Sequence, residues 1–177
     1  MSGHSKWAQI KHQKGAADAR KSKEFSKLSR LISIAARKGE NPEMNPELRS
    51  AIEKARSQNM PLDNIERAIK RGAGKITGES TLEQIRCEAY GPAGVAMIID
   101  VITDNRNRSI SEIKHLLNEY GGKLGEPGSA IWAFDYKDGL WKPKIKIEVP
   151  KEDKEKLDKL IRALDENEDV QNIYVNV

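Results

Sequence analysis

The hydrophobic period of the chain changes near residue 84, and this change limits the folds that the chain can adopt. Before it, apolar residues repeat at three- and four-residue spacing, as they do in residues 25–36, and this spacing predicts amphipathic helices. After it, apolar residues form continuous or alternating runs, beginning with residues 95–102, and such runs are typical of strands. The sequence therefore predicts an α+β chain whose first part is helical.

Three to four helices are predicted in the first 75 residues. A weak, strongly basic helix begins near Lys6, and a second helix covers residues 25–36. An Asn-Pro pair opens the helix at 45–58, because asparagine caps a helix N-terminus and proline suits the first helical position. A Met-Pro pair precedes the helix at 60–71, which the glycines of 72–74 stop. These helices are expected to form a small bundle.

The second part of the chain predicts a sheet with two helices. The run at 95–102 suits a central strand buried on both faces, and the strict alternation at 144–149 suits a strand with one solvated face. The expected order is strand, helix, strand, strand, helix, strand, which is that of a ferredoxin-like βαββαβ sandwich. We therefore predict a basic helical domain at residues 1–78 and a ferredoxin-like α/β domain at residues 79–177. The expected elements of the second domain are strands at 95–102, 130–136, 144–149 and 170–177 and helices at 109–120 and 151–164.

Positive charge is concentrated near the N-terminus. Residues 1–75 hold 17 Lys and Arg against 8 Asp and Glu, whereas residues 76–177 hold 14 against 19. Residues 1–38 alone hold 10 basic and 2 acidic residues. Such a segregated positive field is the usual electrostatic footprint of a polyanion-binding protein. The alternative is that these lysines and arginines only solvate helix faces.

Composition and motifs exclude several other classes of protein. The single Cys87 excludes an intramolecular disulfide and a cysteine-based zinc finger, and no run approaches the roughly 18 apolar residues that a membrane span needs. The N-terminus lacks the apolar stretch of a secretory signal, so a cytoplasmic location with no membrane partner is expected.

No catalytic centre emerges from the sequence. His4 and His12 stand among lysines without carboxylates or thiols at ligand spacing, which disfavours a metal site. Cys87 lies beside Arg86, but a lone cysteine near a strand is more often core filling than a nucleophile. We found no nucleotide-binding glycine loop and no nucleophile elbow. The sequence therefore predicts no catalytic residue, no metal, no cofactor and no enzyme.

Candidate contacts to nucleic acid lie first in the basic helices. Cations there are suited to pairing with phosphates, which gives affinity without reading bases. Trp7 either stacks on a base or packs in the bundle. The candidate residues are Lys6, Trp7, Lys11, His12, Lys14, Arg20, Lys21, Lys23, Lys27 and Arg30.

Two loops are further candidates. Asn105, Arg106, Asn107 and Arg108 stand where a buried strand passes into a helix. Arginines at a helix start oppose its dipole, and together with free backbone N–H groups they suit a phosphate, so contact with a ligand or RNA is one interpretation. A helix cap with a structural salt bridge is the other. The glycine-rich segment 121–129 is better explained as a helix end followed by a turn.

Short motifs in a fixed order extend over nearly the whole chain. They are Gly3-His4-Ser5-Lys6-Trp7, Ile10-Lys11-His12, Asn45-Pro46-Glu47-Leu48-Arg49, Asn59-Met60-Pro61, the segment 65–72, Tyr90-Gly91-Pro92, the segment 103–108, the loop 121–129, and the segment 169–174. In these motifs the chain resembles the YebC/PmpR family, which includes the mitochondrial translational activator of cytochrome c oxidase.

The resemblance implies a helical N-terminal domain followed by an α/β portion. Family members are usually labelled DNA-binding transcriptional regulators, and others are described as translation factors that help the ribosome through difficult sequences such as proline runs. Members typically carry an extra α/β domain inserted between the halves of the sandwich. In this chain the expected strand ending at Tyr136 passes almost directly into the next one, so the insertion is expected to be missing near 137–143.

Together these observations predict a non-enzymatic nucleic-acid-binding regulator of gene expression. The first hypothesis is a monomeric, ribosome-associated translation factor that contacts ribosomal RNA or tRNA, because shape-based RNA contact needs only placed cations on a rigid scaffold. A transcriptional regulator bound to promoter DNA is the first alternative. The second alternative is a protein-interaction or small-ligand-sensing module that uses the free face of the sheet.

Overall fold

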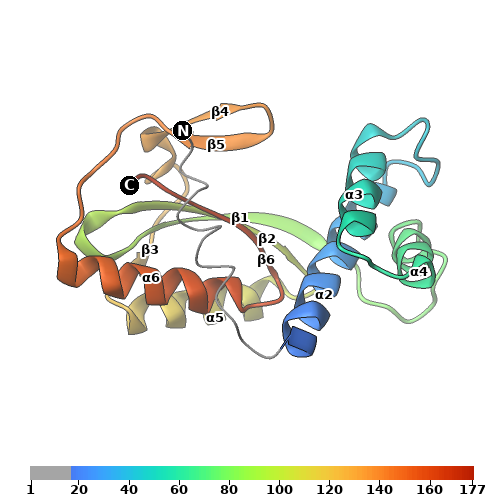
Figure 1. Ribbon diagram of the computed structural model, residues 1–177, viewed down its shortest axis with the longest axis horizontal. Helices are drawn as coiled ribbons and strands as arrows, with labels where there is room; N and C mark the ends of the chain where they lie inside the picture. The colour runs from blue at the N-terminus through green and yellow to red at the C-terminus, as the bar shows by residue number, and fades with distance from the viewer. Residues whose placement is uncertain (1–16) are drawn as a thin grey trace. The chain divides into compact units, whose positions relative to one another are not determined.

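The computed structural model describes residues 17–177, and these form two compact units (Figure 1). The α/β unit holds Ile85–Val101 and Arg106–Val177. The helical unit holds the described residues up to Gln84 together with Ile102–Asn105. The predicted residues Lys6, Trp7, Lys11, His12 and Lys14 lie outside the described part of the chain.

The helical unit is built from α2 (Ala17–Ala36), α3 (Pro46–Ser57) and α4 (Leu62–Gly72). α2 is a single continuous helix, so the predicted helix at 25–36 extends back to Ala17. Apolar residues at helical spacing from all three helices meet in one core. Its most buried members are Ile32, Leu48, Ala55, Ala68, Ile65 and Ala36.

Asn45 joins the end of α2 to the start of α3. Its Oδ1 accepts the Leu48 N–H at 3.1 Å, the bond expected of an N-cap residue. Its side-chain amide donates to the carbonyl oxygens of Ala35 and Gly39, both at 2.8 Å. The predicted cap is therefore confirmed, and the same side chain also satisfies carbonyls at the end of the preceding helix.

α2 and α4 approach each other closely near the ends of both helices. The Ser33 hydroxyl donates to the Ala68 carbonyl oxygen at 2.8 Å. A Cβ atom added to Gly72 would collide with the Ser33 carbonyl oxygen and would lie 2.8 Å from the Ala36 Cβ. Glycine is therefore needed at position 72 for this approach, in addition to ending α4.

The α/β unit is built on a four-stranded sheet in the order β3-β1-β2-β6. The strands are β1 (Glu83–Tyr90), β2 (Ala96–Thr103), β3 (Lys123–Leu124) and β6 (Val170–Val175). β1 pairs antiparallel with β3, and β2 pairs antiparallel with β6. Every residue of β2 is buried, which confirms the predicted central strand with both faces covered.

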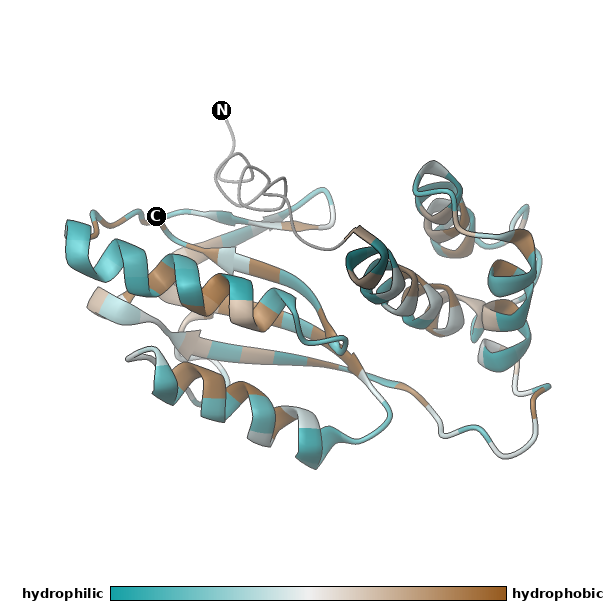
Figure 2. Cartoon of the chain, turned by 60° about the horizontal axis from the view of Figure 1, so that its bottom comes forward, coloured by the Kyte–Doolittle hydropathy of each residue, from teal (hydrophilic) through white to brown (hydrophobic). Residues whose placement is uncertain are grey.

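Two helices cover one face of this sheet, α5 (Arg106–Glu119) and α6 (Lys151–Asp165). Each carries an apolar stripe that packs on alternate residues of β1 and β2, visible as brown bands in Figure 2. The main core lies between them and the sheet. Its largest fully buried residues are Val95, Met97, Ile99, Val101, Ile113, Leu117, Leu160 and Leu164.

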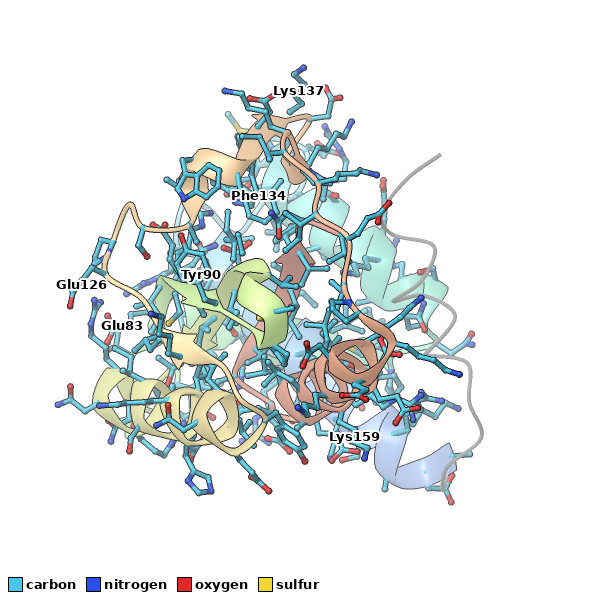
Figure 3. All side chains as sticks on the ribbon, turned by 90° about the vertical axis from the view of Figure 1, so that its left-hand side faces the viewer. Glu83, Tyr90, Glu126, Phe134, Lys137 and Lys159 are labelled. Carbon is cyan, nitrogen blue, oxygen red and sulfur yellow. The ribbon has the colours of Figure 1, made fainter. Side chains whose placement is uncertain are left out.

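The opposite face of the sheet carries a second, smaller core. It involves the short 3-10 helix η2 (Ile131–Ala133) and β4 (Phe134–Lys137), which pairs with β5 (Leu140–Pro143) in a separate hairpin. The other short 3-10 helix, η1 (Pro92–Gly94), follows β1 and contacts α6. Ala133 and Phe134 pack on Ile98 and Tyr174 of the sheet. In Figure 3, Phe134 and Lys137 lie on one side of Tyr90, and Lys159 of α6 lies on the other.

The predicted α+β class, with helices followed by a sheet and helices, is confirmed, but individual strands of the predicted βαββαβ order differ. β1 was not predicted, because Arg86 and Glu88, which alternate with its residues of the main core, interrupt the apolar pattern. The predicted strand 130–136 divides into η2 and β4, and β4 pairs with β5 outside the main sheet.

The segment 144–149 is not a strand, and only two of its three alternating apolar residues face the core, because Ile145 is exposed. Ile147 and Val149 pack on the main core. However, the segment makes only isolated backbone bonds, such as that from the Ile147 N–H to the Asn176 carbonyl oxygen at 2.9 Å. The Asn176 side chain instead links this segment to β2, because it accepts from the Ala96 N–H at 2.8 Å and donates to the Ile145 carbonyl oxygen at 3.0 Å.

Candidate nucleic-acid interface

The predicted cations of α2 differ in their access to solvent. Arg20 and Lys21 are exposed, whereas Lys23 and Arg30 are half-buried. Lys27 is only 8% exposed. The surface of α2 therefore offers Arg20 and Lys21 most directly to a large ligand.

A groove of about 540 Å³ lies between α2 and α4. Its apolar lining includes Phe25, Met60 and Ala68. Hydroxyl groups enter it from α2 at helical spacing, and cations stand along it on both helices. The polar lining residues are Lys21, Ser22, Ser26, Ser29, Asn64, Arg67 and Arg71, with the carboxylates of Asp18 and Glu79.

Two arginines of α4 hold one carboxylate in this groove. Arg67 Nη2 lies 3.2 Å from Glu79 Oε1, and Arg71 Nε lies 2.8 Å from Glu79 Oε2. Arg71 Nη2 also donates to the Ser80 carbonyl oxygen at 3.3 Å. The Arg71 and Glu79 side chains are 25% and 24% exposed, whereas Arg67 is 75% exposed. The pair between Arg71 and Glu79 is thus partly shielded from solvent.

Sequence reasoning did not select Arg67, Arg71 or Asn64 as site residues. The signal that could have identified the two arginines is their four-residue spacing within the segment 65–72, which places them on one face of α4. The partner Glu79 carries no signal of its own, because only folding of the segment after α4 brings it to that face.

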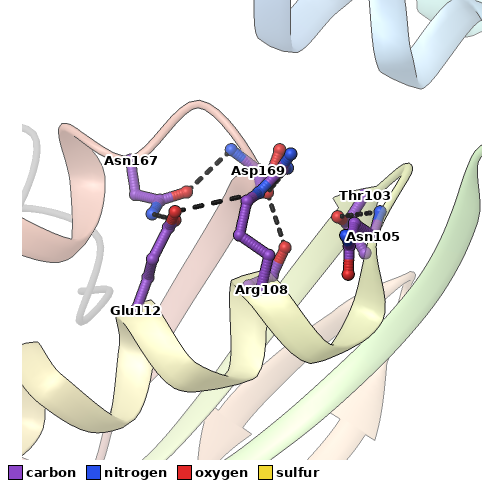
Figure 4. Close-up of polar contacts among 7 residues, drawn as sticks. Thr103, Asn105, Arg108, Glu112, Asn167 and Asp169 are labelled. Carbon is purple, nitrogen blue, oxygen red and sulfur yellow. Dashed lines mark hydrogen bonds and ion pairs between the residues drawn. The ribbon is translucent and has the colours of Figure 1, made fainter.

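The segment 103–108 forms the turn into α5 (Figure 4). The Asn105 N–H donates to Thr103 Oγ1 at 2.9 Å, and α5 begins at Arg106. Asn105, Arg106, Asn107 and Arg108 are all exposed. The structure therefore places the four predicted residues together at the surface of this helix start.

Arg108 takes part in a salt bridge within the protein. Its Nη2 lies 2.7 Å from Asp169 Oδ2, and the Ser109 hydroxyl donates to the same oxygen at 2.6 Å. The Asp169 side chain is only 4% exposed. Arg108 thus makes a salt bridge of the kind that one of the two interpretations predicts, and contact of residues 105–108 with an external ligand stays a prediction.

The residues around Asp169 tie the segment before β6 to α5 (Figure 4). The Asp169 N–H donates to Asn167 Oδ1 at 2.9 Å, and Asn167 Nδ2 donates to Glu112 Oε2 at 2.8 Å. Arg108 Nε also lies 3.7 Å from Glu112 Oε1. This network gives the first turns of α5 a fixed position.

Glu88 holds the glycine-rich loop that follows β3. Its carboxylate accepts the N–H groups of Gly128, Ala130 and Ile131 at 2.7, 2.7 and 2.8 Å. Burial raises the pKa of Glu88, but these three donors and the Arg86 guanidinium outweigh it, so the pKa lies below its ordinary value. The favoured prediction for residues 121–129, a helix end and a turn, is confirmed by the Gly122 N–H bond to the Leu117 carbonyl oxygen at 2.7 Å.

The small-ligand alternative requires a free sheet face opposite the two helices, but this face is covered. The segment from Ala130 to Trp141 packs on it. Arg86 pairs with Asp100 at 2.9 Å and lies over the Trp141 ring at 4.8 Å from its centroid. Burial, together with the Asp100 charge, raises the pKa of Tyr174 to about 12. The face is thus filled by the protein's own aromatic and ionic contacts, although Trp132 and Tyr136 stay exposed at its edge.

Within residues 17–177, no three His, Cys, Asp or Glu side chains gather in a way that would hold a metal ion. Cys87 lies in the main core, and burial raises the pKa of its thiol, an effect that Arg106 partly opposes. No helix in this part of the chain is both long and apolar enough to cross a bilayer.

The fold and the groove define an α+β protein in which a helical unit carries a cationic groove and an antiparallel sheet unit follows. Residues 5–75 match the family model described as the TACO1/YebC protein N-terminal domain. Residues 82–140 and 138–177 match the model described as the TACO1/YebC second and third domain. The chain belongs to the TACO1/YebC family, and the resemblance to it is confirmed.

Relatives from several organisms are similar over most of this chain. A "Probable transcriptional regulatory protein" of Petrotoga mobilis is 51% identical over 178 residues, which cover 96% of this chain and 68% of the relative. One from Dictyoglomus turgidum is 55% identical over 79% of this chain, but the match covers only 56% of that relative. The chain thus matches 56% to 68% of the length of these two relatives.

A solved structure has the same fold. It is a conserved hypothetical protein from Aquifex aeolicus, 35% identical, with a TM-score of 0.87. The match covers 97% of this chain and 96% of that chain. The fold described here is therefore shared with that solved structure.

Proposed function

We propose that this chain is a non-enzymatic, nucleic-acid-binding regulator of gene expression. The observation that carries the proposal is the excess of 10 basic over 2 acidic residues in positions 1–38, part of which forms the exposed surface of α2. The relatives are named probable transcriptional regulatory proteins, and these names support a regulatory role.

Within this role we favour a translation factor that binds the ribosome through ribosomal RNA or tRNA. Cations on a rigid helical scaffold suit the backbone of folded RNA, which proteins recognise largely by shape. Binding to promoter DNA is the alternative, and the names of the relatives favour it. A cytoplasmic location and a monomeric state remain predictions that go with either target.

The expected absence of an inserted domain fits the comparisons. The two stretches that match the second family model meet at residues 138–140, within the turn between β4 and β5. The alignment with a relative from Fervidobacterium nodosum extends over 236 residues, whereas this chain has 177. We infer that longer relatives carry their additional domain at this hairpin, and that the cationic helical domain is the part of the binding function kept here.

Sedimentation through sucrose gradients tests the choice of target. Tagged protein from gently lysed cells is run at low and high salt, with and without RNase. Co-migration with ribosomal particles that is lost at high salt and after RNase supports the RNA target, because phosphate contacts weaken steeply with salt. Protein that stays at the top of the gradient at low salt contradicts it, and promoter DNA is then tested next.

Charge reversal of Lys6, Lys11 and Lys14 to Glu tests the contact itself. We expect binding to weaken equally for all nucleic-acid sequences, because phosphate contacts carry no sequence information. The slope of log K against log salt should fall by about 2 for single strands if all three contacts are lost. Fluorescence anisotropy measures both quantities, and circular dichroism shows whether the fold is kept. Unchanged binding, or loss of the fold, contradicts a purely electrostatic role for these lysines.

A further inference from the structure

We propose that the groove between α2 and α4 is a binding site for a backbone phosphate of nucleic acid, and that Glu79 occupies it in the free protein. The inference rests on the proposed function and locates one of its contacts. It is carried by the arrangement of Arg67, Arg71 and Glu79 and by the other side chains that line the groove.

The two arginines hold the Glu79 carboxylate from two sides. Arg67 reaches one oxygen at 3.2 Å and Arg71 reaches the other at 2.8 Å. Guanidinium groups bind carboxylate and phosphate with the same paired oxygen contacts, and phosphate presents more oxygens and more charge. The arginine pair is therefore suited to a phosphodiester as well as to Glu79.

The rest of the groove supplies further donors. The hydroxyls of Ser22, Ser26 and Ser29 line it from α2, and Asn64 lines it from α4. Hydroxyl and amide groups are common partners of phosphate and sugar oxygens. An ion pair that serves only stability needs no such row of donors beside it.

The charge in the groove also favours an external anion. Its cations are Lys21, Arg67 and Arg71, and its carboxylates are Asp18 and Glu79. When a phosphate displaces Glu79, only Asp18 is left to offset three cations. Glu79 thus lowers the affinity of the groove for anions in the free protein, and its removal is expected to raise that affinity.

Glu79→Gln removes this competition, and Glu40→Gln is the matched control. Both changes remove one negative charge. Glu79→Gln removes the pairs with Arg67 and Arg71, whereas Glu40→Gln removes the pair with Lys75 at 2.7 Å, which involves no residue that lines the groove. A double variant, Glu79→Gln with Arg71→Gln, removes the more buried arginine. Circular dichroism confirms that each variant is folded.

The first measurement is the thermal unfolding midpoint at increasing inorganic phosphate, with chloride keeping the ionic strength constant. We expect phosphate to raise the midpoint of Glu79→Gln by about 3 °C, since an anion bound only by the folded state stabilises it. Wild type, Glu40→Gln and the double variant should respond much less. An equal response in Glu79→Gln and Glu40→Gln overturns the site.

The second measurement is binding of a fluorescein-labelled single-stranded RNA by anisotropy. We expect Glu79→Gln to bind about fivefold more tightly than Glu40→Gln, with a salt slope steeper by about 0.7 for one added phosphate contact. Equal affinities for these two variants, with no phosphate response, reject the site but leave the proposed function standing. A phosphate response through Arg71 without any binding of RNA or DNA keeps the anion site and rejects the proposed function.

Discussion

Replacing Glu88 with glutamine tests how the sheet holds the glycine-rich loop. In the folded protein the carboxylate accepts three N–H groups, one at Oε1 from Gly128 and two at Oε2 from Ala130 and Ile131. Glutamine has a single acceptor oxygen. If that oxygen keeps the two bonds at the Oε2 position, its NH₂ group faces the Gly128 N–H, and two donors then oppose each other.

The expected cost follows from these bonds. A hydrogen bond to a charged group contributes about 2 kcal/mol, and a neutral one contributes about 1 kcal/mol. Three charge-assisted bonds thus become two neutral ones, which is a loss of about 4 kcal/mol before relaxation, and some relaxation of the loop reduces it to about 3 kcal/mol. Glu88 is only 8% exposed, so water does not replace the missing bond easily.

Urea unfolding followed by circular dichroism measures this loss at neutral pH, with Glu126→Gln as the control. Glu126 is an exposed residue of the same loop, so its substitution should change stability by less than about 0.5 kcal/mol. Hydrogen exchange at Gly128, Ala130 and Ile131 should speed up only in Glu88→Gln. Equal stability of the two variants would refute the assignment of Glu88 as the residue that fixes the loop.

The pH dependence of stability provides an independent check. The fold lowers the pKa of Glu88 below its ordinary value of 4.5, so its ionised form stabilises the folded state. This stabilisation is fully present above pH 4.5 and is lost as the pH falls below that value through the folded-state pKa. The difference in stability between wild type and Glu88→Gln should therefore shrink in that acid range and stay constant above it.

Two other substitutions test the packing of each unit. Gly72→Ala should destabilise the helical unit by about 2 kcal/mol in urea unfolding, because the new Cβ collides with the Ser33 carbonyl oxygen. In an open helix the same change would stabilise by about 1 kcal/mol, and such a gain would contradict this reasoning. Asp169→Asn should lower the free energy of unfolding by about 2 kcal/mol, because it weakens the buried acceptor of Arg108 and Ser109. The loss is smaller than for a fully buried pair, because the Arg108 side chain is 42% exposed. Arg108→Gln in both backgrounds gives the coupling energy, and a coupling near zero contradicts the salt bridge.

Local sequence signals predicted most of the regular elements. The Asn-Pro pair predicted the start of α3, and the apolar stripes predicted α4, α5 and α6 close to their observed bounds, whereas α2 begins at Ala17, well before the predicted helix at 25–36. The run at 95–102 predicted β2, because a strand covered on both faces has no polar side to interrupt the pattern. These signals act between near neighbours in the chain, so they can be read without knowing the fold.

Elements whose polar residues have distant partners were predicted less well. β1 carries Arg86 and Glu88, whose charges are acceptable only because Asp100, Trp141 and the loop after β3 meet them. For the candidate interface, the sequence identified the excess of cations, but not that Lys27 is buried or that Arg108 is held by Asp169.

The sequence by itself determined the helical and extended parts of the chain, the class of fold, the family and the segregation of charge. Each of these follows from residue type and short-range spacing. Only the tertiary structure decided the strand order β3-β1-β2-β6, the separate β4–β5 hairpin and the placing of Glu79 between two arginines. The physical reason is that these features depend on contacts between residues far apart in the chain, for which hydrophobic period and local propensity carry no information.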